Sequence, residues 1–255
     1  RMVKPASAKR KVAVVGGGPA GMEFARVCAE RGHDVTLYEQ SGELGGMLKH
    51  AKYPSFKWPL RQFMEYMIRE MDRLGVHVKL NTKATKELLQ QENFEVLALA
   101  LGAEPSSLPL PGKDGKNVSY AANIYGHEDT LGKNVTIIGG GEIGVETGLY
   151  LAELGHLVTV LEMQYDLILD APHAHYRNMV VNYWRHTANF AYRAGVKCTA
   201  IEADGVCYDD PDGKPQKQMA DNVLLAIGMT SKSDEAMELA SAVPYSVVIG
   251  DCDKP

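Results

Sequence analysis

The sequence predicts an α/β protein built from two copies of one strand–helix–strand unit, because the same pattern of residues occurs twice. Each copy begins with a buried strand, at 11–15 and at 134–138, and continues through a glycine-rich turn into a helix-like segment. A second strand follows each helix and ends at a glutamate, Glu39 in the first copy and Glu162 in the second. Two such units predict two Rossmann-like domains with parallel strands.

Both turns have the spacing GxGxxG, in which each glycine has a separate task. The first allows the tight turn, the second lets a pyrophosphate approach the backbone, and the third lets the helix pack on the strand. The helix N-terminus attracts the phosphates, and the glutamate accepts hydrogen bonds from a ribose. The residues expected to bind the first dinucleotide are Gly16, Gly18, Pro19, Ala20, Gly21, Glu39 and Gln40. Those expected to bind the second are Gly139, Gly141, Glu142, Ile143, Gly144 and Glu162.

Three glutamates each have an alternative interpretation. Glu39 and Glu162 are either ribose ligands or simple solvent-facing strand ends, and their place in complete motifs favours ribose binding. Glu146 lies one turn into the second helix. It is either a cofactor contact near the nicotinamide or an ordinary helix carboxylate, and both interpretations stand.

Composition argues against several other classes of protein. The net charge of −5 disfavours a nucleic-acid binder, and no apolar run reaches the roughly 18 residues that span a membrane. Neither a signal peptide, a CxxC dithiol nor a cluster of metal ligands stands out, so we expect a cytoplasmic protein without a bound metal. No catalytic acid or base is expected, because hydride transfer between two bound dinucleotides needs none.

The remaining elements follow from periodicity and turn signals. A helix with an apolar stripe precedes a short strand at 76–80. Thr85 is expected to cap a helix over 86–91, and the buried strand 94–101 ends at Gly102. The apolar stripe, expected to face the core, contains Leu60, Phe63, Met64, Met67, Ile68, Met71 and Leu74.

A stretch rich in proline, serine and glycine, 103–117, is typical of a crossover between domains. Within the second half, 209–213 is expected to be the turn of a β-hairpin. The buried strand 222–227 ends at Gly228 and echoes the strand that ends at Gly102. A short helix and a strand follow, at 233–241 and 245–249.

Taken together, the motifs resemble the C-terminal, dinucleotide-binding part of the NADH:flavin oxidoreductase family. This family includes 2,4-dienoyl-CoA reductase, 2-enoate reductase and trimethylamine dehydrogenase. The resemblance covers nearly the whole chain, and it is carried by 11–23, 32–39, 42–46, 139–146 and 248–252.

The resemblance implies an FAD-binding domain interrupted by an NAD(H)-binding domain. The FAD-binding domain would contain 1–103 and 229–255, and the NAD(H)-binding domain would contain 104–228. The family commonly has threonine where this chain has Leu101, so a hydroxyl group is lost there. Further cofactor contacts that the resemblance implies are Gly45, Gly46, Gly102, Gly228, Gly250 and Asp251.

The activity implied is that of an NADH-dependent flavin oxidoreductase, in which NADH in the second domain reduces FAD in the first. Full-length relatives in this family carry an N-terminal FMN barrel and an iron–sulfur cluster. The chain is therefore expected to be a fragment, with those regions of the same enzyme as its partners, and to reduce no enoate by itself. The alternative is a structural domain that holds ADP in the first site without hydride transfer, as in the amine dehydrogenases of the family.

Overall fold

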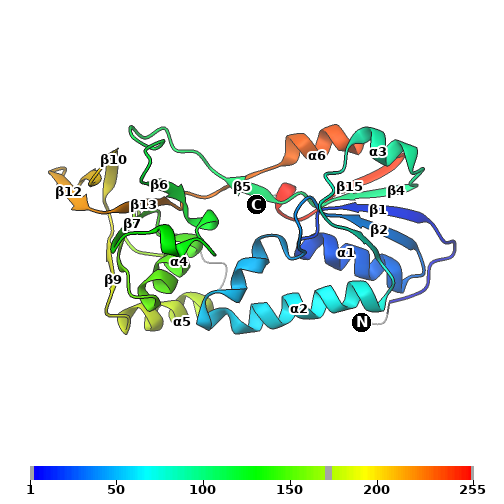
Figure 1. The fold of residues 1–255 in the computed structure, drawn as a ribbon, viewed down its shortest axis with the longest axis horizontal. Coiled ribbons are helices and arrows are strands. Elements are labelled where there is room, and N and C mark those ends of the chain that lie inside the picture. The colour runs from blue at the N-terminus through cyan, green and yellow to red at the C-terminus, as the bar shows by residue number, and fades with distance from the viewer. Residues whose placement is uncertain (1–2, 170–173, 254–255) are drawn as a thin grey trace. The chain divides into compact units, whose positions relative to one another are not determined.

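A computed structural model describes residues 3–169 and 174–253, which form two compact units. Unit 1 consists of Arg1–Lys52, Phe56–Glu104 and Met229–Pro255, and unit 2 consists of Tyr53–Ser55 and Pro105–Gly228. In Figure 1 the blue start and the red end of the chain therefore belong to one unit, and the segments from β6 to β13, coloured from green through yellow to orange, belong to the other. Two segments that carry the chain from one unit to the other, β5 (Ala103–Pro105) and β14 (Met229–Ser231), pair as a two-stranded sheet.

The core of unit 1 is a five-stranded parallel sheet in the order β15-β4-β1-β2-β3. Alternate residues of β1 enter two apolar clusters, with Ala13 and Val15 in one and Val12 and Val14 in the other. The centre of the sheet is therefore buried on both faces, as expected for parallel strands. The strands are β1 Lys11–Val15, β2 Asp34–Tyr38, β3 His77–Lys79, β4 Val96–Leu99 and β15 Tyr245–Val248.

Four helices cover this sheet, two on each face (Figure 1). Helices α1 (Pro19–Glu30) and α2 (Trp58–Arg73) pack on the cluster that contains Val12 and Val14. Helices α3 (Lys86–Gln91) and α6 (Ser233–Ala240) pack on the opposite cluster. The short 3-10 helices among the described residues are η1 Gly46–Lys52, η2 Ser55–Lys57, η3 Ala121–Asn123, η4 Glu128–Thr130 and η5 Gly250–Cys252.

The apolar stripe predicted along α2 is only partly buried. Met64, Met67 and Met71 lie in the core as expected, but 43% of Leu60 and 46% of Phe63 is exposed. Leu60 lies in the first turn of the helix, ahead of the buried methionines, and Phe63 lies at the edge of the stripe. Helical periodicity predicted the direction of the buried face correctly, but not how much of the helix the neighbouring elements cover.

Unit 2 is built around a second five-stranded parallel sheet, in the order β6-β13-β7-β8-β9. Helices α4 (Glu142–Glu153) and α5 (Ala174–Arg185) connect its strands. No helix among the described residues is long and apolar enough to cross a membrane. The strands are β6 Val118–Tyr120, β7 Asn134–Ile138, β8 Leu157–Leu161, β9 Phe190–Arg193 and β13 Asn222–Leu225.

A three-stranded antiparallel sheet completes unit 2. Ile138 and Leu161 of the parallel sheet share an apolar cluster with Val206 and Tyr208 of this smaller sheet. The hairpin turn predicted at 209–213 lies between its second and third strands. The three strands are β10 Lys197–Glu202, β11 Gly205–Asp209 and β12 Pro215–Met219.

The topology determines where each glycine turn lies. All strands of a parallel sheet end at one edge, and ligands bind there, at the point where the strand order reverses. In unit 1 the glycine turn follows β1, which has β4 on one side and β2 on the other. In unit 2 the turn follows β7, which lies between β13 and β8. Both turns therefore occupy equivalent positions at the ligand-binding edge.

The N-terminal cap of α3 gives a first testable prediction. The Thr85 Oγ1 accepts a hydrogen bond from the Leu88 N–H at 3.2 Å, as the sequence predicted. We expect Thr85→Ala to lower the free energy of unfolding by about 1 kcal/mol, because it leaves that N–H without its cap. Chemical denaturation measures this loss, and Thr85→Ser, which keeps the hydroxyl, serves as the control. Equal stability of the alanine variant and the wild type would contradict the assignment.

Candidate functional site

The first glycine turn is closed tightly at both of its ends. Gly16 has a φ of +107°, and a Cβ atom on it would lie 2.1 Å from the Ala100 carbonyl oxygen. A Cβ on Gly21 would lie 1.9 Å from the Gly16 carbonyl oxygen. No larger side chain fits at these two positions without displacing backbone, so glycine is required for the turn itself and for the packing of α1.

Gly18 is different, because it has both ordinary backbone angles and open space. Its φ of −76° and ψ of −179° suit any residue, and a Cβ there would have only the Gly46 Cα nearby, at 3.8 Å. The first helical hydrogen bond runs from the Met22 N–H to the Gly18 carbonyl, and no described side chain caps the helix. The N–H groups of the first turn are thus left for another acceptor, as in a phosphate site.

The Glu39 carboxylate is fixed in place beside this turn. Its side chain is only 8% exposed, and its Oε2 accepts a hydrogen bond from the Gly17 N–H at 2.8 Å. Its Oε1 accepts a second one from the Ser41 N–H at 2.7 Å. Glu39 is therefore no solvent-facing strand end, and charge-assisted bonds hold an acceptor at the end of β2.

Two further loops reach the same helix start. The Gly45 N–H donates to the Gly17 carbonyl at 2.8 Å, and a Cβ on Gly46 would lie 2.9 Å from the Gly18 Cα. From the other end of the chain, a Cβ on Gly250 would lie 2.8 Å from the Ala20 Cβ. Asp251 follows and is exposed. The structure thus gathers the predicted positions 16–21, 39, 45–46 and 250 around one helix terminus.

The other predicted positions of unit 1 lie at the edges of this group. Pro19 is the first residue of α1, a position where the missing N–H of proline has no cost. Gln40 directly follows Glu39 and is exposed. Gly102 has a φ of +74°, and its carbonyl accepts the Lys232 N–H at 3.2 Å, which assigns it to a backbone turn. Leu101, the departure from the family pattern, packs against the apolar cluster.

The second turn repeats the geometry of the first. Gly139 also has a φ of +107°, and a Cβ on it would lie 2.2 Å from the Ala226 carbonyl oxygen. A Cβ on Gly144 would lie 2.0 Å from the Gly139 carbonyl oxygen, whereas a Cβ on Gly141 would have no neighbour within 4 Å. The same open space therefore lies beside the start of α4.

The Glu162 carboxylate repeats the arrangement of Glu39. It is 7% exposed, and its two oxygens accept hydrogen bonds from the Gly140 N–H at 2.5 Å and the Gln164 N–H at 2.6 Å. Burial raises the pKa of the Cys198 thiol to about 11, and the nearby Glu162 charge adds to this. The thiol is therefore a neutral neighbour of the carboxylate at neutral pH.

The two sites differ at the first helical residue. Helix α1 begins with Pro19 and has no acidic residue in its first turn, whereas α4 begins with Glu142. Ile143 follows and is half-buried. Gly228 has a φ of +105° and accepts the Ser106 N–H at 3.0 Å, so it forms a turn like Gly102. Glu142 therefore places a negative side chain at the N-terminus of α4.

Glu146 lies one turn further along α4 and is buried, with 7% of its surface exposed. Its Oε1 accepts a hydrogen bond from the hydroxyl group of Tyr176, which belongs to α5. The sequence offered no signal for this pairing, because α5 lies in a stretch without clear helical periodicity.

Several residues that shape the sites were not predicted. The carbonyl groups of Ala100 and Ala226 approach the two first glycines, and the side chains of Leu44 and Leu167 lie under the middle glycines, Gly17 and Gly140. One signal was present, because Ala-x-Gly ends both buried strands, at 100–102 and 226–228. This repeated tripeptide identifies the strand whose carbonyl group contacts the first glycine of each turn.

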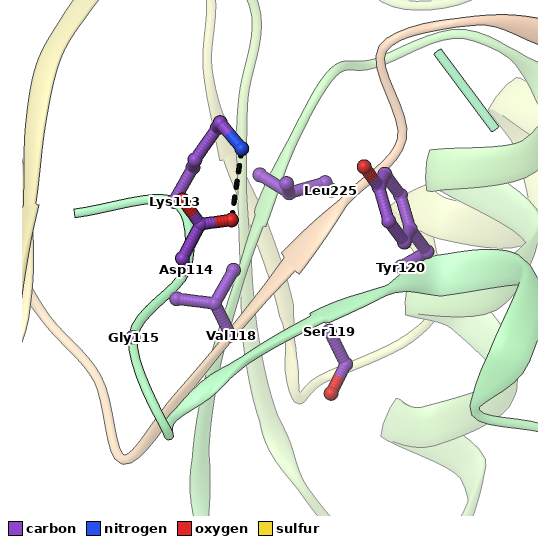
Figure 2. Close-up of a pocket in the computed structure, with 7 residues that line it drawn as sticks. All are labelled: Lys113, Asp114, Gly115, Val118, Ser119, Tyr120 and Leu225. Atoms are coloured by element: carbon purple, nitrogen blue, oxygen red, sulfur yellow. Dashed lines mark hydrogen bonds and ion pairs between the residues drawn. The ribbon is translucent and has the colours of Figure 1, made fainter. Parts of the chain in front are cut away.

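Unit 2 also contains a cavity of about 270 Å3 beside β6 and the preceding loop (Figure 2). The Lys113 amino group pairs with the Asp114 carboxylate at 2.8 Å and closes one side of it. None of the predicted dinucleotide ligands lines this cavity, so we assign it no part in the site. Its lining residues are Lys113, Asp114, Gly115, Val118, Ser119, Tyr120 and Leu225.

Two parallel sheets, each with a glycine turn and a fixed acidic side chain at its carboxyl edge, define a dinucleotide-binding protein with two sites. The chain belongs to the pyridine nucleotide-disulphide oxidoreductase family, whose model matches residues 10–246. It is therefore an oxidoreductase with flavin and nicotinamide cofactors. The predicted α/β fold class, with its FAD/NAD-linked reductase type, is confirmed.

Individual relatives agree with the resemblance found in the sequence. The chain is 34% identical to a cinnamate reductase of Clostridium sporogenes over 99% of this chain and 38% of the relative. It is 34% identical to an NADH oxidase of Thermoanaerobacter brockii over 98% of this chain and 39% of that protein. A solved 2-naphthoyl-CoA reductase has a TM-score of 0.94 and 35% identity, over all of this chain and 38% of its own. The chain thus spans about two fifths of the length of these relatives.

Proposed function

We propose that this chain passes a hydride from NADH, bound in unit 2, to FAD, bound in unit 1. The observation that supports the proposal most is the repetition of one complete dinucleotide site. In each unit a glycine leaves open space beside a helix N-terminus, and a doubly hydrogen-bonded glutamate follows the next strand. Two dinucleotides in one reductase chain are the minimum that hydride transfer between cofactors requires.

The residues of unit 1 fit a permanently bound FAD. Gly18 and Gly46 leave the backbone bare where a pyrophosphate would lie, and the α1 N-terminus has no acidic side chain to repel it. Glu39 would hold the ribose hydroxyls, and Gly250 and Asp251 would contact the flavin side. When bound, FAD supplies the acceptor for the hydride, while the first-turn N–H groups of α1 would donate hydrogen bonds to its phosphates.

The residues of unit 2 fit a dinucleotide that binds reversibly. Gly139, Gly141 and Gly144 repeat the phosphate site, but the Glu142 carboxylate stands in the first turn of α4 and opposes a second negative group. We infer weaker binding in unit 2 than in unit 1. A weaker site suits NADH, which must exchange in each catalytic cycle.

The longer protein that contains this chain is part of the same proposal. Relatives extend well beyond the matched region, and the family resemblance places an FMN barrel and an iron–sulfur cluster in such regions. We propose that electrons leave FAD for those parts, in the cytoplasm. Two of the relatives are a cinnamate reductase and a 2-naphthoyl-CoA reductase. Their names support the proposal that the longer protein reduces a carboxylic-acid derivative.

Identification of the bound nucleotide tests the proposal. Nucleotides released from the purified full-length protein by denaturation are separated by chromatography, and FAD is expected in one equivalent per chain. ADP in place of FAD would instead support the alternative, a nucleotide-binding domain without hydride transfer. Release of neither nucleotide, with no uptake of added FAD, would reject both.

The position of Glu162 predicts a preference for NADH over NADPH. The 2′-phosphate of NADPH would meet a carboxylate that two backbone N–H groups hold in place, so Glu162 cannot swing away. Like charges at a binding site cost several kcal/mol, and each 1.4 kcal/mol or so is a factor of ten in affinity. We expect kcat/KM for NADPH to be at least about tenfold lower, measured by reduction of an artificial electron acceptor.

A pair of variants makes this test specific. Glu162→Gln removes the charge and should reduce the preference for NADH, whereas Glu65→Gln removes an exposed charge on α2 of unit 1 and should leave it unchanged. Equal or faster turnover with NADPH in the wild type would show that Glu162 does not face the 2′ position.

A further inference from the structure

We propose that Tyr53 is a positioning residue for hydride transfer, because it attaches a short segment between η1 and α2 to the helix that carries the second phosphate site. This inference rests on the proposed function, since it requires FAD in unit 1 and NADH in unit 2. The three residues Tyr53–Ser55 belong to unit 2, although Lys52 before them and Phe56 after them belong to unit 1. We call this three-residue segment the strap.

Tyr53 packs against two tyrosine rings of unit 2. Its ring centroid lies 5.7 Å from that of Tyr125 and 6.3 Å from that of Tyr150, and those two rings stack on each other at 5.5 Å. Aromatic rings at such separations attract one another more than their buried area alone predicts. A Cβ atom on Gly126 would lie 2.6 Å from the Tyr53 hydroxyl oxygen, so the phenol lies directly against bare backbone.

The two partner rings are themselves held in place. The hydroxyl of Tyr150, a residue of α4, donates a hydrogen bond to the Glu128 Oε1 at 2.8 Å. The Tyr125 hydroxyl lies 2.9 Å from the Oγ1 of Thr147, which also belongs to α4. Hydrogen bonds to buried or half-buried groups restrict the orientation of the rings. Tyr53 therefore packs on a surface of fixed shape.

A second contact attaches the other end of the strap to the same helix. The Ser55 hydroxyl donates a hydrogen bond to the Glu153 Oε1 at 2.8 Å. Glu153 is the last residue of α4 and follows Tyr150 by three residues, so the two attachment points are neighbours on the helix surface. Pro54 lies between them, is buried and has a φ fixed by its ring. The strap is therefore stiff and is held at two adjacent points on α4.

Along the chain, the strap connects the two dinucleotide sites. Helix η1, which precedes it, begins at Gly46, and Gly46 lies beside Gly18 in the first site. Helix α4, to which the strap is attached, begins at the glycine turn of the second site. The other connections between the units, β5 and β14, pair with each other and can act as one hinge. An additional attachment at the strap restricts rotation about such a hinge.

Hydride transfer is the step that depends on this restriction. The predicted dinucleotide contacts of each site belong to a single unit, so binding of either dinucleotide does not require the strap. For transfer, the nicotinamide and flavin rings must come within about 3.5 Å of each other. NADH then gives up a hydride and becomes NAD+, and the flavin accepts it and becomes FADH−. The strap raises the fraction of molecules in which the units have the arrangement that this step needs.

The variants Tyr53→Ala and Tyr53→Phe test the proposal in the full-length protein. The rate of flavin reduction is followed after rapid anaerobic mixing with saturating NADH, and FAD content and NAD+ affinity are measured separately. For Tyr53→Ala we expect the rate to fall about tenfold, with FAD content and NAD+ affinity within about twofold of the wild type. Tyr53→Phe keeps the ring, so we expect its rate to stay within about threefold of the wild type.

Two further variants complete the experiment. Tyr66→Ala removes an exposed ring from α2 and should change none of these quantities. Ser55→Ala removes only the second attachment and should slow flavin reduction about threefold, and it decides the question if Tyr53→Ala fails to fold. Dithionite, which needs no nucleotide site, should reduce the flavin of every variant as it does in the wild type.

Three results would overturn the proposal. The first is flavin reduction at the wild-type rate in folded Tyr53→Ala, or in Ser55→Ala where it decides the question. The second is a loss of FAD or NAD+ affinity that accounts for the slower rate, and the third is equal impairment of Tyr53→Phe and Tyr53→Ala. Absence of flavin reduction by NADH in the wild type would instead overturn the proposed function on which the inference rests.

Discussion

Gly18→Val is expected to yield a folded protein that has lost its FAD. The backbone angles at Gly18 suit valine, and a Cβ there meets no atom closer than 3.8 Å, so the fold itself tolerates the change. The added methyl groups would occupy the space beside the α1 N-terminus where the pyrophosphate is proposed to lie. We expect FAD affinity to fall at least 100-fold, or roughly 2.7 kcal/mol.

The measurement is the FAD content of the purified variant, followed by titration of the protein with added FAD. Gly21→Val is the contrasting variant, because its Cβ would lie 1.9 Å from the Gly16 carbonyl oxygen and the helix could not pack. Loss of cooperative unfolding is therefore expected for Gly21→Val and not for Gly18→Val. One equivalent of FAD in folded Gly18→Val would show that the pyrophosphate lies elsewhere.

The sequence predicted the sites through local chemistry. A positive φ at Gly16 and Gly139, close helix packing at Gly21 and Gly144, and an acceptor at Glu39 and Glu162 all belong to short segments whose spacing is visible in the chain. The structure adds that each glutamate also binds the middle N–H of its own turn. That second contact explains why the glutamate and the glycine turn occur together, because the carboxylate stabilises the turn beside it.

Contacts between distant segments were beyond such reasoning. Ala100 closes the turn at Gly16, and Ala226 closes the turn at Gly139, because β4 and β13 lie beside β1 and β7 in their sheets. Strand order is a property of the whole fold, so no local pattern reveals it. The partner of Glu146 was missed for the same reason, since Tyr176 lies 30 residues away on a helix that pairs with α4 only after folding.

Gly141→Val is expected to impair NADH binding in unit 2 and to leave FAD binding in unit 1 unchanged. A Cβ on Gly141 would have no neighbour within 4 Å, and its φ of −72° and ψ of −174° suit valine, so the fold should again tolerate the change. Because Gly141 belongs to unit 2, FAD should stay bound in unit 1 while NADH loses its pyrophosphate site. We expect kcat/KM for NADH to fall at least 100-fold with an artificial acceptor, again about 2.7 kcal/mol.

Reduction by dithionite distinguishes loss of NADH binding from damage to the flavin. The chemical reductant needs no nucleotide site, so it should bleach the flavin of Gly141→Val as it does in the wild type. Gly18→Val and Gly141→Val are thus expected to have opposite phenotypes. Gly18→Val loses FAD, which accepts the hydride, and Gly141→Val loses NADH, which donates it. If Gly141→Val instead released FAD, or kept NADH turnover within fivefold of the wild type, the assignment of FAD to unit 1 and NADH to unit 2 would be wrong. The comparison of these two variants is a direct test of the assignment, because the same substitution is made in the same local structure and only the unit differs.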